Sequence, residues 1–198
     1  MTSIIAIALM IAIAAITPGP NNVIVMTQAS AAKPAAIAGS VGAIVIGGAA
    51  MIALATSLTS FPLVEHAAPW LTLAGAALLA LLAIQQAFHA GSPQQSGSAL
   101  KSPLALLAFQ WVNPKAWIMA TLIASAGAAS GYPSPMLVAI FAIISATCLT
   151  IWAFGGRVIS AWANTSDRRK WVERGLAAAL FVTAAQIAFS QLGDIGRQ

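Results

Sequence analysis

Long stretches of apolar residues make up most of this chain. Within them, polar and apolar positions do not alternate, and no polar helix face is apparent. A helix that crosses the hydrocarbon core of a bilayer needs about 20 predominantly apolar residues. Runs such as 4–16 and 71–84 show no alternation of polar and apolar positions, so a β-barrel is not indicated. We predict six membrane-spanning helices, at about 3–27, 36–60, 68–90, 103–126, 135–158 and 173–192.

The composition agrees with a membrane location. Of the 198 residues, 60% are hydrophobic and 7% are charged, whereas about a quarter of the residues in a soluble domain are charged. The net charge of +5 does not indicate nucleic-acid binding, because the basic residues flank the predicted spans, where such residues orient a membrane protein. Cys148 is the single cysteine, so an internal disulfide is excluded.

The basic residues also predict which side of the membrane each loop occupies. Short loops that are rich in Lys and Arg stay in the cytoplasm. Arg197 is the one basic residue on the opposite side, in the C-terminal tail. Both termini are therefore predicted on the non-cytoplasmic side. The basic residues of the predicted cytoplasmic side are Lys33, Lys101, Arg157, Arg168, Arg169, Lys170 and Arg174.

A polar segment at 91–102, rich in Gly, Ser and Gln, has the composition of a linker. It divides a single membrane domain, 1–198, into a first half at 1–90 and a second half at 103–198, with three predicted spans in each. Because three is odd, the second half enters the membrane in the opposite sense. Inverted halves of this kind are common in secondary transporters. The predicted fold class is an all-α integral membrane protein with two inverted three-helix halves.

The first predicted span is interrupted by Pro18-Gly19-Pro20-Asn21-Asn22. Each proline lacks an N–H and clashes with the carbonyl group four residues before it. We expect a broken helix near mid-depth, where Pro20 begins a second half-helix whose free N–H groups favour an anion. The alternative is a packing kink whose freed carbonyl groups are satisfied by Thr17 and water.

The fourth predicted span contains Asn113-Pro114-Lys115 and is expected to be broken in the same way. Lys115 follows about 12 residues of the span, which places it roughly 18 Å deep, near the midplane. A charge at that depth costs about 2.5 kcal/mol or more, so it should face a cavity or a partner. Two roles fit Lys115: attraction of an anionic substrate group, or a clamp on carbonyl groups that the prolines free.

Other polar and aromatic residues have structural interpretations. Small residues recur every four positions in span two, at Ala35, Gly39, Ala43 and Gly47, which allows close approach of another helix. Polar residues inside spans are expected to form interhelical hydrogen bonds: Gln85, Gln86, Gln110, Thr150 and Gln186. Four tryptophans are interpreted as interfacial anchors: Trp70, Trp111, Trp152 and Trp171.

The two interrupted spans together resemble the paired signatures of the LysE/RhtB family of amino-acid exporters. The residues that carry this resemblance are Thr17-Pro18-Gly19-Pro20-Asn21 and Asn113-Pro114-Lys115. It extends along nearly the whole chain, through the polar linker and the basic loop before the last span. It implies a six-helix bundle with inverted halves in a bacterial inner membrane, which exports amino acids or their derivatives with energy from an electrochemical gradient.

We therefore predict a secondary transporter whose substrate binds at mid-depth between spans one and four. Lys115 and the N–H groups after Pro20 would attract a carboxylate, and Asn21 and Asn113 would hydrogen-bond the substrate. The predicted substrate-binding residues are Thr17, Pro18, Gly19, Pro20, Asn21, Asn113, Pro114 and Lys115.

The sequence also bears on three other functional classes. An exporter of another small ion or a metal and a non-transporting structural subunit remain alternatives. An enzyme is not indicated, because the predicted spans contain no Ser/His pair, no paired aspartates and no zinc motif. No ATP-binding motif is present, and no cofactor or metal is expected. The expected partners are the lipid bilayer and an amino-acid-like molecule, without nucleic acid, and a homo-oligomer is left open.

Overall fold

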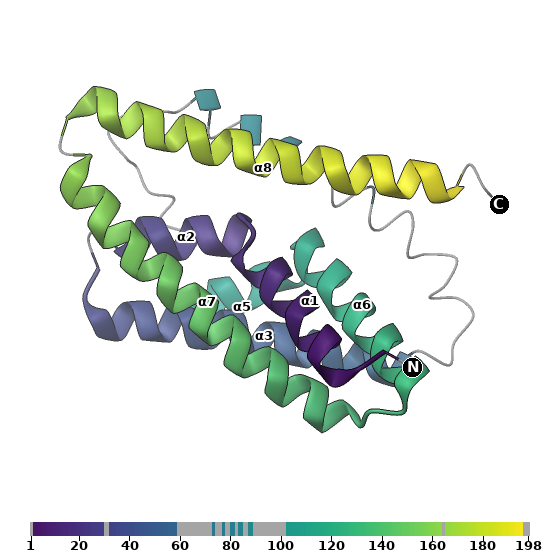
Figure 1. Ribbon diagram of the computed structural model, residues 1–198. Helices are drawn as coiled ribbons and strands as arrows, with labels where there is room; N and C mark the ends of the chain where they lie inside the picture. Colours follow the sequence, from purple (N-terminus) through teal and green to yellow (C-terminus); the bar gives the residue numbers. More distant parts are fainter. Residues whose placement is uncertain are drawn as a thin grey trace.

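The structure is a computed structural model that describes residues 2–29, 32–58, 102–163 and 165–195, with scattered positions between 73 and 88. In this part of the chain every regular element is a helix, which confirms the all-α prediction (Figure 1). Most of the third predicted span and most of the linker at 91–102 lie outside the described residues. The helices are α1 (Ile4–Ile16), α2 (Pro20–Ala29), α3 (Pro34–Leu58), α5 (Pro103–Gln110), α6 (Pro114–Ser130), α7 (Ser134–Trp162) and α8 (Ser166–Ile195).

The described helices include clear candidates for membrane spans. Helices α3 and α7 are each long and apolar enough to cross a bilayer. Helices α1 and α2 are a third candidate if they form one span, and they meet at a bend of 57°. The predicted break in the first span is thus present. The total of six spans and the inverted relation of the halves remain predictions.

Local sequence explains where several helices begin and end. Ser3 and Ser102 cap α1 and α5, because their hydroxyl oxygens accept hydrogen bonds from the N–H groups of Ala6 at 3.2 Å and Ala105 at 3.1 Å. Helix α6 ends at Ser130 and is followed by the C-cap Gly131, whose φ of 73° is in the left-handed region that glycine adopts without steric cost. These ends follow from chemistry within one turn of each helix.

Helix α7 contacts α1, α2 and α3, and the core forms along these contacts (Figure 1). One apolar cluster joins α1, α3, α6 and α7 and includes Ile7, Ile11, Met51, Ile123 and Leu137. A second cluster joins α2, α3, α5 and α7 and includes Val25, Ile37, Ile44, Leu106 and Leu149. The polar residues described below lie where these two clusters meet.

The small residues of α3 allow α5 to approach closely. A Cβ atom on Gly47 would lie 2.6 Å from Cγ of Gln110, and one on Gly39 would lie 3.4 Å from Cγ of Pro103. Ala43 is buried between these positions, whereas Ala35 is exposed. The predicted close approach is confirmed for Gly39 and Gly47, and the partner is the short helix that leads to the second break.

Candidate functional site

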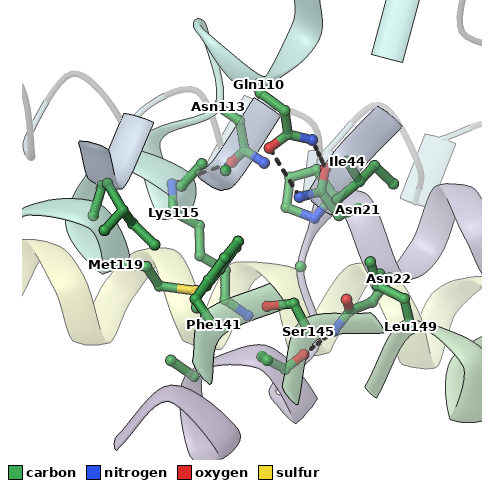
Figure 2. Close-up of a pocket in the computed structure, with 18 residues that line it drawn as sticks. Asn21, Asn22, Ile44, Gln110, Asn113, Lys115, Met119, Phe141, Ser145 and Leu149 are labelled. Atoms are coloured by element: carbon green, nitrogen blue, oxygen red, sulfur yellow. Dashed lines mark hydrogen bonds between the residues drawn. The ribbon is translucent and has the colours of Figure 1, made fainter. Parts of the chain in front are cut away.

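The two helix breaks lie against each other (Figure 2). Helix α1 ends at Ile16 and α2 begins at Pro20, while α5 ends at Gln110 and α6 begins at Pro114. Lys115 connects the breaks, because its Nζ donates hydrogen bonds to the carbonyl oxygens of Thr17 and Pro18. The charge at the second break therefore contacts the backbone of the first break, as expected of a clamp.

Other side chains bind several of the carbonyl groups at the end of α1. The last four carbonyl groups of any α-helix have no partner within the helix. Asn22 Nδ2 donates to the carbonyl oxygens of Ala15 at 2.9 Å and Thr17 at 2.8 Å. Trp152 Nε1 donates to the carbonyl oxygen of Ile16 at 3.1 Å. Trp152, interpreted from the sequence as an interfacial anchor, thus has a hydrogen-bond partner at the helix break.

Two carboxamides join the breaks by a second route. Asn21 Nδ2 donates to Gln110 Oε1 at 3.1 Å, and Gln110 Nε2 donates to Asn21 Oδ1 at 2.9 Å (Figure 2). Gln110 is 1% exposed. This pair confirms the interhelical role that was predicted for Gln110. By contrast, Thr150 was expected to bond between helices, but its hydroxyl donates to Ala146 in its own helix.

The second break is closed by contacts within its own segment. Asn113 Oδ1 accepts from the backbone N–H of Lys115 at 3.2 Å, which makes Asn113 the N-cap of α6. Trp117 Nε1 donates to the carbonyl oxygen of Trp111 at 2.9 Å, and the two indole rings meet edge to face at 5.9 Å. The side-chain oxygen of Asn113 is thus engaged by the helix that carries Lys115.

Gly19 lets Lys115 reach the first break. A Cβ atom on Gly19 would lie 2.8 Å from Cδ and 3.0 Å from Nζ of Lys115. Cβ atoms are essentially never found so close to another heavy atom, so a larger residue would displace the lysine side chain. Because Gly19 has no side chain, the ammonium group of Lys115 can lie next to the first break.

A small cavity of about 50 Å³ lies at this crossing, with room for a few water molecules. Apolar residues of α3, α6 and α7, such as Ile44, Met119 and Phe141, form one part of its wall (Figure 2). The polar side chains of the lining belong to Asn21, Asn22, Gln110, Asn113, Lys115 and Ser145. The cavity is thus polar near the breaks and apolar away from them.

The structure brings the predicted site residues together at this cavity. Those that line it are Gly19, Pro20, Asn21, Asn113 and Lys115. Thr17 and Pro18 take part through their carbonyl oxygens, and Pro114 is the first residue of α6. Ser145 and Asn22 were not predicted. Ser145 could have been found by spacing, because it falls four residues after Phe141 and four before Leu149 on the buried face of α7.

The charge distribution at the crossing favours an anion more than a metal ion. Lys115 lies at the carbonyl end of α1, where the helix dipole favours a cation. The N–H end of α2 begins at Pro20, on the wall of the same cavity. In the described part of the chain, no three His, Cys, Asp or Glu side chains gather as metal ligands.

The comparison with known families covers both breaks. A family model described as LysE type translocator matches residues 12–191. No curated protein and no solved structure matches the chain. The match spans the residues from the first break to the last described helix, and it agrees with apolar helices long enough to cross a bilayer. The chain belongs to the LysE type translocator family, a family of transporters rather than enzymes, and is a multi-pass membrane protein.

Proposed function

We propose that this transporter exports amino acids or their derivatives from a bacterial cytoplasm, and that the substrate binds in the cavity between the two helix breaks. The observation that supports this proposal is the contact of Lys115 Nζ with the carbonyl oxygens of Thr17 and Pro18. An amino acid carries one anionic and one cationic group. The crossing offers a cation and a helix N-terminus for the first group, and the carbonyl oxygens of Thr17 and Pro18, which lie between two helices, for the second.

The groups at the crossing satisfy one another in this conformation. Lys115 occupies the two carbonyl oxygens, and Asn21 and Gln110 occupy each other. The ammonium of Lys115 therefore stands where the ammonium of a substrate would bind. A substrate that takes over the carbonyl oxygens of Thr17 and Pro18 would release Lys115 to bind its carboxylate. This exchange replaces one set of charge-assisted hydrogen bonds by another.

Two alternatives predict different behaviour. A divalent-metal exporter needs carboxylate, thiolate or imidazole ligands, and the cavity lining contains amides, one hydroxyl and one ammonium. A structural subunit would need Lys115 for stability alone. Transport coupled to an ion gradient or to exchange fits the absence of an ATP-binding motif from the sequence.

The test is Lys115→Met, which keeps much of the side-chain volume and removes the charge. Removal of a buried charge from a span regains about 2.5–3.5 kcal/mol. Loss of two charge-assisted hydrogen bonds costs about 1.5–3 kcal/mol each. Because these terms are comparable, we expect the variant to insert and fold. Efflux per folded molecule should fall by about tenfold or more, as the loss of one such bond to substrate implies.

Two further variants make the test specific. Lys115→Arg should restore efflux poorly, because the planar guanidinium has a different geometry from the ammonium. Lys170→Met removes the same charge from an exposed position on α8 and should leave efflux unchanged. Efflux of a panel of amino acids from cells, normalised to folded protein, gives the readout. A Lys115→Met protein that exports at the normal rate per molecule would eliminate the substrate role and leave the clamp.

A further inference from the structure

A second cavity opens between α3 and α7. It has a volume of about 520 Å³ and shares no lining residue with the cavity at the helix breaks. Its walls run from Pro34 to Ile46 on α3 and from Ala146 to Arg157 on α7. The two helices run in opposite directions, so Pro34 and Arg157 lie at the same end (Figure 1). We call this cavity the α3–α7 groove.

The α3–α7 groove is apolar and open to the outside of the bundle. Ile46 is 63% exposed and Phe154 is 70% exposed. A Cβ atom on Gly42 would meet nothing within 4 Å, so the groove is empty above this glycine. Because both helices qualify as membrane spans, the groove faces lipid tails. Its occupant should therefore be apolar over most of its length.

The length of the groove fits an acyl chain of one leaflet. Twelve residues separate Pro34 from Ile46, which corresponds to roughly 18 Å at 1.5 Å per residue. Half of the hydrocarbon core of a bilayer is about 15 Å thick. The groove thus extends from one membrane surface to about the depth at which a lipid tail ends.

The side chain of Arg157 provides a positive charge at the surface end of the groove. Arg157 lines the groove and is exposed, and its guanidinium forms no hydrogen bond or ion pair with any described residue. Lys33, which is also exposed, directly precedes Pro34 at the same end. A guanidinium binds a phosphate through two parallel hydrogen bonds. The groove is therefore complementary to a molecule with an apolar tail and an anionic head.

We propose that the α3–α7 groove is a binding site for an anionic phospholipid, with one acyl chain between the helices and its phosphate at Arg157. The acyl chain gains little binding free energy when it leaves the bilayer for the groove, because lipid tails are as apolar as leucine. Selectivity must come from the head group. Two basic residues near the surface imply a preference of roughly 30-fold for an anionic over a zwitterionic lipid. This proposal does not depend on the substrate of the transporter.

The experiment measures lipid binding to the full-length protein in detergent by native mass spectrometry. The probes are dioleoyl phosphatidylglycerol and dioleoyl phosphatidylcholine, which share their tails and differ in net charge. The wild-type protein should retain the phosphatidylglycerol at roughly 30-fold lower concentration. Arg157→Gln should lower this preference by about fivefold. Gly42→Leu fills the groove and should abolish retention of both lipids.

Two controls match these variants. Lys170→Gln removes one exposed positive charge on α8, and Gly155→Leu adds the same side chain at a glycine of α7 whose Cβ direction is also open but which does not line the groove. Both should bind lipid as the wild type does. If Gly42→Leu fails to fold, Ala38→Leu narrows the groove from an exposed position on the same helix.

Four results would overturn the proposal. Equal loss of preference in Arg157→Gln and Lys170→Gln would indicate diffuse surface charge. Unchanged retention in Gly42→Leu and Ala38→Leu would place the lipid elsewhere. A change of oligomeric state in Gly42→Leu without loss of lipid would mean that a second copy of the chain occupies the groove. Binding of glycerol 3-phosphate as tight as that of phosphatidylglycerol would show an anion site without an acyl chain.

Discussion

The two helix breaks are closed by different kinds of contact. At the first break, the carbonyl oxygens of Ile16 and Thr17 accept from Trp152 and Lys115, which are 136 and 98 residues away from them in the sequence. At the second break, Asn113 caps α6 through the N–H of Lys115, two residues on. The carbonyl groups of the first break thus depend partly on distant donors, whereas the start of α6 at the second break is capped by its own segment.

This difference assigns the breaks different mechanical roles. The local contacts of the second break fix the start of α6, and with it the backbone from which Lys115 extends. The geometry of the first break depends on side chains of α2, α6 and α7, because these donate hydrogen bonds to its carbonyl groups. A substrate that competes for those carbonyl groups acts on the first break. We infer that the first break is the part of the site that responds to binding.

The largest effect on stability is expected at the first break, from Asn22→Leu. The change removes both hydrogen bonds of Asn22 Nδ2, to the part-buried carbonyl groups of Ala15 and Thr17. The free energy of unfolding in detergent should fall by about 1–3 kcal/mol. Thr147→Val is the control, because the exposed Thr147 hydroxyl donates only within α7, to Ile143. Equal stability of both variants would show that the first break does not need the donor that α2 supplies.

A smaller effect is expected at the second break, from Asn113→Ala. Loss of an N-cap costs about 1 kcal/mol, and the contact between Trp111 and Trp117 should still hold the segment. Thermal unfolding in detergent measures this cost. A loss of stability greater than that of Asn22→Leu would reverse the contrast between the two breaks.

The smallest effect on stability, with a clear effect on transport, is expected from Gly19→Ala. The new Cβ would lie 2.8 Å from Cδ of Lys115, near the flexible end of that side chain, so the lysine can move aside. Alanine also costs the chain less backbone entropy than glycine does. Stability should change by less than about 1 kcal/mol, while efflux per folded molecule should fall. Gly175→Ala, with open space around its Cβ direction, is the matched control. Unchanged efflux in Gly19→Ala would show that the position of Lys115 does not matter for transport.

The positions of both breaks could be predicted from the sequence because their causes are local. Pro18 and Pro20 cannot continue α1, and Pro114 after Asn113 is a favoured helix start. The close approach at Gly39 and Gly47 could also be predicted, because residues four positions apart lie on the same face of a helix. A repeat of small residues at this spacing therefore makes one face of α3 flat enough for another helix to come close. The partner of that face, α5, could not be read from the repeat.

The sequence by itself determined the all-helical membrane class, the two helix breaks and the isolated charge of Lys115, because composition, proline and charge act within a few residues. The tertiary structure decided which groups meet. Gln110 pairs with Asn21 across 89 residues, and Trp152 binds the end of α1, because α7 packs against α1 and α2. The same packing of α7 places Ser145 in the lining of the cavity. Several donors could have satisfied each freed carbonyl group, and helix packing alone brought these within hydrogen-bond distance.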